Sequence, residues 1–310
     1  MRIFIILVLL LNVLFSYTLS IFSSDNMQKY SKYYIDVGRA YANEGKYDDA
    51  IWFYQRALII QPNSDTAFCN MGLAYYHIDE ISKALNMCKK AIYSNPKNIE
   101  LYKYLGMLYN DMQDYYKAYK AYSKATEINP KDLDSLIYIG DFYGVIKKDF
   151  NLSQKFYKKA IEASPKDYRA YFHLAYLYMD KKNYTKAISF LKKSTILHPF
   201  EADVYHNLFE LQLINNMDFD PEIENSYISK FKDNKKNFAI YEMLKIMRQI
   251  YKGKKISLEK WNRKYKNIYL PDSWQFDLLE EWINKLPKGI RKVKLTRALY
   301  LFKEHKKDTF

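Results

Sequence analysis

The side chains that most often carry catalysis or bind metals are sparse and scattered in this 310-residue chain. Its five histidines are His77, His173, His198, His206 and His305. The sequence has no G-x-x-x-x-G-K-[ST], H-E-x-x-H or G-x-S-x-G segment. Its acidic residues show no spacing typical of an acid–base pair. We therefore expect no catalytic residue, no metal site and no cofactor, and the protein is predicted not to be an enzyme.

The scarce turn-forming residues reveal a repeat instead. The chain has only eight prolines and eight glycines, which excludes collagen and Pro/Gly-rich disorder. Five of the prolines are separated by 34, 34, 35 and 34 residues, and four of the glycines by 34 each. They are Pro62, Pro96, Pro130, Pro165 and Pro199, with Gly38, Gly72, Gly106 and Gly140. Ala175 continues the glycine series. A period of this length indicates a repeat architecture.

Each period predicts a helical hairpin. Apolar residues recur at spacings of three and four, as in an amphipathic helix. Small residues, such as Gly38 in a first helix and Ala57 in a second, let two backbones approach, while Tyr41 and Tyr54 fill the flanking gaps. The proline ends the second helix because it cannot continue the hydrogen-bond ladder. One hairpin cannot cover its own apolar face, so successive hairpins must stack.

This pattern resembles the tetratricopeptide repeat. The first unit matches it with Tyr34, Val37, Gly38, Tyr41, Ala50, Tyr54, Ala57 and Pro62. The second matches with Phe68, Met71, Gly72, Tyr75, Ala84, Cys88, Ala91 and Pro96, and the third with Tyr102, Leu105, Gly106, Tyr109, Ala118, Tyr122, Ala125 and Pro130. The resemblance implies an all-α, right-handed α-solenoid of tetratricopeptide-like hairpins. We expect five repeats over residues 31–201, namely 31–64, 65–98, 99–132, 133–167 and 168–201.

Two departures from the period are visible. The fourth unit carries one extra residue between its helices, in the stretch 144–151, which we expect to widen that turn. Residues 202–234 form a degenerate sixth repeat, with Phe209 at the small position and a loss of register around residues 215–221. Residues 235–310 have no period and are predicted to form a helical C-terminal cap, with helices near 238–251, 256–269, 273–286 and 290–303.

The repeat also places the thiols and two histidines. Cys88 occupies the packing position between the two helices of its hairpin. Cys69 should lie on the face of the first helix where the family's partners bind. Export would permit a disulfide between them, but these positions favour two buried or half-buried thiols. His173 and His206 occupy similar positions in successive units. No further ligand stands near them, so we interpret them as surface or packing residues.

The first 24 residues are predicted to be a targeting segment. Residues 3–15 are apolar except for Asn12 and follow Arg2, as in a secretory signal peptide. Residues 3–22 carry no charge, so an uncleaved N-terminal membrane anchor is the alternative. Either interpretation predicts an exported protein, periplasmic or extracytoplasmic, or held at the membrane by this segment.

The net charge of +14 is concentrated near the C-terminus. Residues 235–310 hold 20 basic and 8 acidic side chains. A solvated, Lys-rich surface is one interpretation. The other is a patch that meets an acidic membrane surface or partner, with Trp261, Tyr265 and Tyr269 at the interface. The candidate patch is Lys254, Lys255, Lys260, Arg263, Lys264, Lys288, Arg291, Lys292 and Lys294. Export argues against a nucleic-acid partner.

The resemblance implies a partner-binding groove lined by the first helix of each unit. The corresponding residues are Lys32, Ile35, Arg39, Cys69, Leu73, Tyr76, Lys103, Met107, Asn110, Ile137, Asp141, Phe172, Tyr176 and Met179. The subtype that clamps a chaperone's C-terminal carboxylate is excluded, because Glu100 would repel it. We therefore predict a non-catalytic adaptor or scaffold of the cell envelope that binds a peptide or helix of a partner protein. The alternative is a peripheral acidic-lipid binding protein that acts through the basic C-terminal helices.

Overall fold

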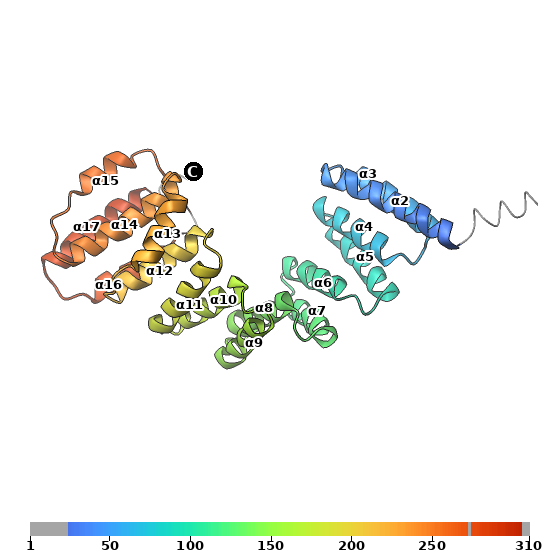
Figure 1. Ribbon diagram of the computed structural model, residues 1–310, viewed down its shortest axis with the longest axis horizontal. Helices are drawn as coiled ribbons and strands as arrows, with labels where there is room; N and C mark the ends of the chain where they lie inside the picture. Colours follow the sequence, from blue (N-terminus) through green and yellow to red (C-terminus); the bar gives the residue numbers. More distant parts are fainter. Residues whose placement is uncertain (1–23, 272–273, 306–310) are drawn as a thin grey trace, which may run out of the picture. The chain divides into compact units, whose positions relative to one another are not determined.

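A computed structural model describes residues 24–271 and 274–305. Within these ranges the regular structure is entirely helical, with sixteen α-helices and one π-helical turn (Figure 1). They are α2 (Ser24–Asn43), α3 (Tyr47–Ile60), α4 (Asp65–His77), α5 (Ile81–Ser94), α6 (Ile99–Asp111), α7 (Tyr115–Ile128), α8 (Leu133–Asp141), η1 (Phe142–Ile146), α9 (Phe150–Ala163), α10 (Tyr168–Asp180), α11 (Tyr184–Leu197), α12 (Ala202–Ile214), α13 (Pro221–Phe231), α14 (Lys235–Tyr251), α15 (Leu258–Lys264), α16 (Asp277–Lys285) and α17 (Ile290–Glu304).

The segment predicted to be a signal peptide or anchor, residues 1–24, lies outside the described residues except for Ser24, which begins α2. Among the helices that the structure describes, none combines the length and the apolar character needed to cross a membrane.

The fold is an all-helical solenoid of stacked hairpins, divided into two compact units that meet in sequence at Phe142 and Tyr143. In the first unit, α2 packs on α3, α4 on α5 and α6 on α7, and each hairpin stacks on the next. The first helices of the later hairpins begin shortly after the periodic prolines. The side chains of Ser64, Asn98, Asp132 and Asp167 cap them by accepting a hydrogen bond from a backbone N–H group of the first turn.

The periodic glycines make room for a tyrosine ring. A Cβ atom on Gly38 would stand 2.5 Å from the ring of Tyr54, and one on Gly106 would stand 2.5 Å from the ring of Tyr122. In the second repeat, residues 65–98, Cys88 takes the place of the tyrosine. The nearest atoms to a Cβ on Gly72 lie at 3.3 Å. Large and small positions of the repeat therefore belong to one packing contact between the two helices of a hairpin.

The turn between the two helices also repeats. A residue with a left-handed backbone recurs at Gly45 (φ 76°), Asp79 (61°), Gln113 (59°), Lys148 (56°), Lys182 (54°) and Asn216 (55°). The following N–H group donates back across the turn, for example from Lys46 to the Tyr41 carbonyl at 2.9 Å and from Glu80 to the Tyr75 carbonyl at 2.9 Å. This is the bonding that closes a Schellman motif at a helix C-terminus. The turn is still present at Asn216, in the sixth hairpin.

The extra residue of the fourth repeat is taken up at the end of its first helix. There α8 passes into the π-helical turn η1, and the Asp149 N–H donates to the Tyr143 carbonyl at 2.8 Å. This bond encloses one residue more than its equivalents in the other turns. A π-turn absorbs a one-residue insertion without breaking the helix. The extra residue thus changes the helix end that leads into the turn.

In the second unit, the C-terminal helices form one continuous hydrophobic core with the last repeats. Phe209 of α12 is fully buried, and its ring lies 4.8 Å from that of Phe219 and 5.7 Å from that of Tyr241. A phenyl ring therefore stands at the position that a small residue holds in the earlier hairpins. The next helix, α13, starts only at Pro221, capped by Asp220.

The C-terminal helices differ from the sequence expectation in two respects. Helix α15 ends at Lys264 and α16 begins at Asp277, so both are shorter than predicted. The expectation that Trp261 and Tyr265 lie at an interface with a membrane was wrong. Both are 2% exposed and belong to the core, and the ring of Trp261 lies 4.6 Å from that of Phe302. Of the three aromatics, only Tyr269 is exposed.

Candidate functional site

The predicted groove residues of the first unit lie on α2, α4, α6 and α8, and we call this surface the N-terminal face. At its start, Lys32, Ile35 and Arg39 of α2 come together with Ser64 and Thr66 around a hollow of about 330 Å³. Ile35 is buried at its floor. Arg39 forms an exposed ion pair with Asp36 at 3.4 Å, so the rim of the hollow carries both charges.

Hydrogen bonds cross-link neighbouring first helices along the N-terminal face. The Tyr76 hydroxyl of α4 donates to Asp111 of α6 at 2.8 Å, and the Tyr138 hydroxyl of α8 donates to Asn110 of α6 at 3.1 Å. The bond to Asp111 raises the pKa of Tyr76. Two of the predicted groove residues, Tyr76 and Asn110, are thus held in fixed positions by their neighbours.

Lys103 is the most enclosed cation of the N-terminal face. Its Nζ lies 3.0 Å from Glu100, 3.0 Å from Asp134 and 3.5 Å from Asp132, and its side chain is 18% exposed. Burial alone would lower the pKa of Lys103, but the hydrogen bonds to Glu100 and Asp134 raise it above the ordinary value. These carboxylates neutralise the charge of Lys103. Because Asp132 and Asp134 stand at the start of α8, Lys103 links α6 to α8.

The remaining predicted residues of the N-terminal face differ in exposure. Leu73 and Met107 are partly buried against a small core that includes Cys88 and Tyr104. Cys69 and Asp141 are half-buried, and Ile137 is buried, so Ile137 offers little surface to a partner. Cys69 and Cys88 are both free thiols. Burial raises the pKa of Cys69 to about 11 and that of Cys88 to about 12, which keeps both in the thiol form.

In the second unit, the predicted residues Phe172, Tyr176 and Met179 lie on α10, and we call this surface the α10 face. The rings of Phe172 and Tyr176 lie 4.6 Å apart. Asn207 of α12 donates to the Tyr176 hydroxyl at 2.6 Å. Tyr176 remains 38% exposed, whereas Phe172 and Met179 are half-buried. The α10 face is therefore an aromatic surface with one anchored hydroxyl.

Three residues of these surfaces were not among the predicted ones: Asp111, Tyr138 and Asn207. Tyr138 and Asn207 share one position of the repeat, two residues before the small position at Gly140 and Phe209. Both make the cross-link to the preceding first helix. The period contained this signal, because equivalent positions of a repeat face the same neighbour.

The nine residues of the predicted basic patch are spread over the C-terminal helices and their loops. Lys264 donates to Glu242 at 2.7 Å, and Lys292 donates to the Asn284 carbonyl at 2.6 Å. Lys292 also donates to the Leu286 carbonyl, so it binds the C-terminal end of α16, where a cation is favoured. The other seven form no ion pair within residues 24–271 and 274–305; they are Lys254, Lys255, Lys260, Arg263, Lys288, Arg291 and Lys294.

The histidines are placed by packing. His206 is fully buried, and its Nε2 lies 2.8 Å from the Tyr227 hydroxyl and 3.1 Å from the Asn237 carbonyl oxygen. His173 lies against the rings of Tyr157 and Phe172. In the part of the chain that the structure describes, no group of three or more His, Cys, Asp or Glu side chains could hold a metal ion.

Sequence comparison identifies the repeat. Family models described as tetratricopeptide repeat match residues 65–98, 99–132, 134–167 and 156–189, and one described as TPR repeat matches residues 38–79. The chain is a tetratricopeptide-repeat protein. A search of curated proteins found no match.

Several solved structures are similar to parts of this chain. The pilF protein of Pseudomonas aeruginosa is 16% identical and aligns with a TM-score of 0.56, over 78% of this chain and 100% of its own. MamA is 23% identical over 54% of this chain and 97% of its own, with a TM-score of 0.48. YrrB, described as a TPR protein with an unusual peptide-binding site, is 21% identical over 56% and 89%, with a TM-score of 0.46. At 16% identity, the likeness to the pilF protein concerns the fold alone.

Proposed function

We propose that this protein is a non-catalytic adaptor or scaffold of the cell envelope, which binds a peptide or helix of a partner protein along the first helices of its repeats. Tetratricopeptide repeats are a scaffold for protein–protein interaction. The observation that carries the proposal is the arrangement of the N-terminal face. Half-buried apolar and aromatic side chains, Leu73, Tyr76 and Met107, share this face with a hollow that has charged residues at its rim.

Preorganisation supports this assignment. Binding is weakened when flexible side chains must be ordered, by about 0.5–1.5 kcal/mol for each immobilised side chain. The hydrogen bonds from Tyr76 to Asp111 and from Tyr138 to Asn110 fix these side chains before a partner arrives. Methionine suits such a surface, because its flexible thioether adapts to different apolar partners.

The proposed location in the envelope rests on the N-terminal segment. Residues 3–22 carry no charge and follow Arg2, a composition that suits a signal peptide or a membrane anchor. N-terminal sequencing of the protein from fractionated cells tests this part. A new N-terminus near residue 20 in the exported fraction would support cleavage, and an intact Met1 in the membrane fraction would support an anchor. An intact protein confined to the cytosol would contradict export.

Site-specific photo-crosslinking tests the binding surface. A photoreactive phenylalanine analogue replaces Tyr76 on the N-terminal face or Tyr176 on the α10 face of the full chain. The matched control is the same replacement at Tyr93 of α5, which is 89% exposed and is not among the predicted groove residues. We expect a discrete crosslinked partner from Tyr76 or Tyr176 and none from Tyr93. Equal crosslinking from Tyr93 would show that the partner does not use the first helices.

A further inference from the structure

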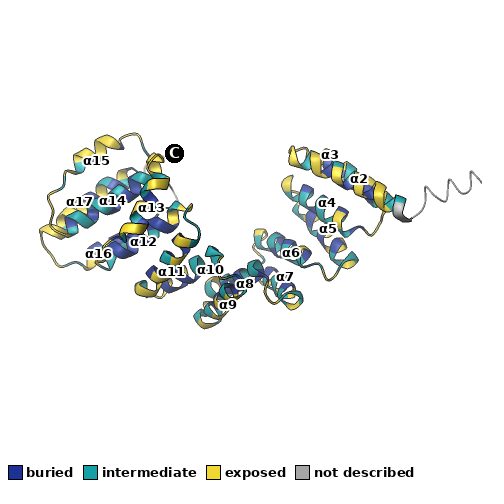
Figure 2. Cartoon of the chain, in the orientation of Figure 1, coloured by how far each residue is buried: buried dark blue, intermediate teal, exposed yellow. Residues whose placement is uncertain are grey.

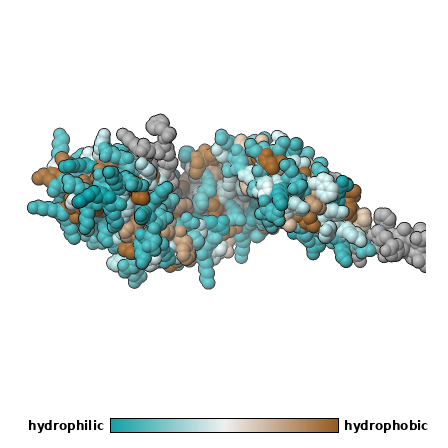
Figure 3. All heavy atoms as spheres, turned by 90° about the horizontal axis from the view of Figure 1, so that it is seen from above, coloured by the Kyte–Doolittle hydropathy of each residue, from teal (hydrophilic) through white to brown (hydrophobic). Residues whose placement is uncertain are grey.

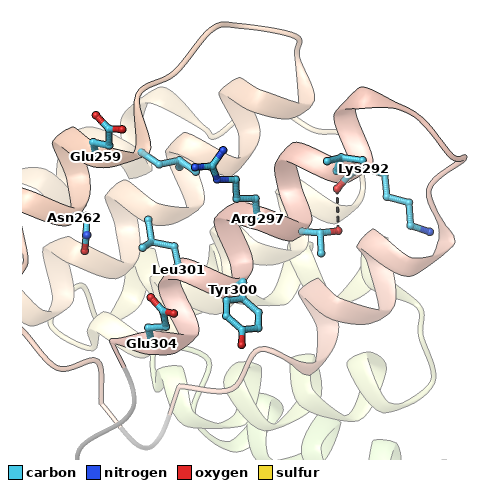
Figure 4. Close-up of a pocket in the computed structure, with 10 residues that line it drawn as sticks. Glu259, Asn262, Lys292, Arg297, Tyr300, Leu301 and Glu304 are labelled. Carbon is cyan, nitrogen blue, oxygen red and sulfur yellow. Dashed lines mark hydrogen bonds between the residues drawn. The ribbon is translucent and has the colours of Figure 1, made fainter.

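A hollow of about 690 Å³ lies between α15 and α17 in the second unit (Figure 4). Leu258 contributes to it from α15, and Val293, Tyr300 and Leu301 contribute from α17. Its volume lies in the range of about 300–1,000 Å³ that is typical of small-molecule sites. The repeats do not form this hollow, so it is separate from the surfaces proposed for the protein partner.

Helix α17 has two apolar faces, and only one of them is buried. Leu295, Ala298 and Phe302 pack into the core. Val293 and Tyr300 face outward beside the hollow and are each 67% exposed. Figure 2 shows that α15, on the other side of the hollow, is largely exposed; Trp261 is its one buried residue. In Figure 3 the surface over the C-terminal helices, toward the left of the view, is mostly hydrophilic. Exposed apolar surface in such surroundings often marks an interaction site.

A second hollow, of about 310 Å³, adjoins the first and is cationic. Lys254 and Lys255 line it from the loop after α14, and Lys294 and Arg297 line it from α17. The two hollows share Leu258, Glu259 and Arg297, so they form one continuous surface. None of the four cations has an ion-pair partner in the described part of the chain. In Figure 4 the Arg297 side chain extends from α17 toward α15. Arg297 lines both hollows, so it stands where they meet.

Contacts between the end of α17 and α15 fix the walls of the apolar hollow. The Nε2 atom of His305, at the end of α17, lies 2.8 Å from Asn262 of α15, and its Nδ1 lies 3.1 Å from the Ile268 carbonyl oxygen. The ring of Trp261 packs 4.8 Å from that of His305. These contacts hold α15 at a set distance from α17, so the hollow exists without a ligand.

From this geometry we propose that the joined hollows bind one molecule of an acidic phospholipid. The headgroup phosphate lies among Lys254, Lys255, Lys294 and Arg297, and an acyl chain follows the apolar hollow along α17. Arginine and lysine are the usual cationic partners of phosphate. This site goes beyond the partner-binding function of the repeats and does not depend on it.

The two carboxylates of the surface set the direction of the ligand. Glu304 lines the apolar hollow ten residues after Lys294, which corresponds to about 15 Å along a helix. An anionic headgroup at that end would be repelled, so it must lie at the cationic end. Glu259 stands at the junction and is outnumbered there by the four cations. A ligand that is anionic at one end and apolar at the other matches this distribution, whereas an anion without a chain would leave the larger hollow empty.

Calorimetric titration of the full chain with dioctanoyl phosphatidylglycerol, below its micelle concentration, tests the proposal. We expect one molecule bound per chain, and no binding of dioctanoyl phosphatidylcholine. Arg297→Glu should weaken binding about tenfold or more, because each cation near an anionic lipid contributes about 1 kcal/mol and the variant reverses a charge. Val293→Asp should also weaken it about tenfold, by adding a charge to the apolar hollow.

Matched variants make the result specific to the two hollows. Arg263→Glu makes the same charge change on α15, and Ile290→Asp makes a similar change on α17; neither residue lines either hollow. Both should bind like the parent. If Arg263→Glu weakened lipid binding as much as Arg297→Glu, the effect would come from the protein's net charge, and the proposed site would be wrong. Equally tight binding of inorganic phosphate or of octanoate would also overturn it, because only one hollow would then be used.

Two further outcomes count against the lipid. Absence of phosphatidylglycerol binding, with far-UV circular dichroism unchanged, contradicts the proposal directly. If instead an amphipathic Glu/Leu peptide binds the parent and is lost in Arg297→Glu, the occupant is a protein segment and the assignment to a phospholipid is wrong.

Discussion

The ring of Tyr54 packs directly on the backbone of Gly38, with its Cε1 atom 2.5 Å from the point where a Cβ would stand. The same relationship recurs two repeats later, between Gly106 and Tyr122. In the fifth repeat the corresponding residues are Ala175 and Leu191, both fully buried. A Cβ is thus present where the partner is the thinner leucine side chain. The small position and the large position of the repeat compensate for each other.

This relationship predicts that Gly38→Ala destabilises the protein. The new methyl group would overlap the buried Tyr54 ring, and overpacking typically costs about 1–3 kcal/mol, which exceeds the gain of about 1 kcal/mol in helix propensity. Adding Tyr54→Leu should recover part of the loss, since it recreates the Ala175–Leu191 pair. Gly72→Ala is the control, because its nearest neighbours lie at 3.3 Å. Urea unfolding followed by circular dichroism measures the parent, Gly38→Ala, Tyr54→Leu, the double variant and the control. Additive losses in the double variant would contradict the compensation.

Lys103 is predicted to stabilise the stacking of α6 on α8. Lys103→Met leaves the nearly buried Asp132 without its cation, which should lower the free energy of unfolding by about 1–3 kcal/mol. Because the pKa of Lys103 is raised above 10.5 in the fold, its contribution is complete below pH 10.5 and is lost as the pH rises through the higher value. Lys117→Met is the matched control, since its pair with Asp114 is exposed. Equal effects of the two variants in urea unfolding would contradict this role.

Glu210 predicts a pH dependence of stability. This carboxyl group of α12 is 2% exposed, and burial, with a smaller effect from Asp277, raises its pKa to about 8. The folded protein therefore holds a proton that the unfolded chain releases above its ordinary pKa of 4.5. Stability should fall as the pH rises from 4.5 to 8, by about 3 kcal/mol at pH 7.

Glu210→Gln removes this titration. Its stability relative to the parent should be similar near pH 4 and should rise steadily between pH 4.5 and 8. Glu222→Gln, at an exposed position of α13, controls for the loss of one charge. Chemical unfolding at a series of pH values measures the difference. A difference that stays constant with pH would show that Glu210 is ionised in the folded protein.

The two thiols should react slowly in the native protein. Burial raises the pKa of Cys69 to about 11 and that of Cys88 to about 12, so little of the reactive thiolate forms at pH 8. We expect slow alkylation of half-buried Cys69 by iodoacetamide and slower alkylation of Cys88. Both should react at the rate of a free cysteine in urea. Mass spectrometry after digestion measures each site. Rapid native labelling of Cys88 would place it at the surface.

The sequence alone was sufficient to identify the repeated hairpin, because the period is carried by residues whose roles are local or between adjacent helices. A proline cannot stand in the interior of a regular helix, whatever the rest of the fold, and a glycine beside a tyrosine permits one close contact. The same reasoning marked Phe209 as a departure from the period. It did not show that Phe209 lies in a core shared with Phe219 and Tyr241, because those contacts depend on helices that follow no repeat.

The candidate binding surfaces were predictable in outline only. The period assigns residues such as Tyr76 and Asn110 to the first helices, but their hydrogen bonds to Asp111 and Tyr138 depend on how neighbouring hairpins stack. Ile35 and Ile137 occupy groove positions by analogy and are buried in the fold.

The C-terminal charges show most clearly what tertiary structure decides. The sequence determined that basic residues dominate positions 235–310, since composition needs no fold. It also suggested an interfacial role for Trp261 and Tyr265, which the core excludes. Only the packing of α14 against α17 brings Lys254 and Lys255, in the loop after α14, next to Lys294 and Arg297, some forty residues later, beside an apolar hollow. A local period can be recognised in the sequence itself, whereas a site made by distant segments exists only once their helices have packed.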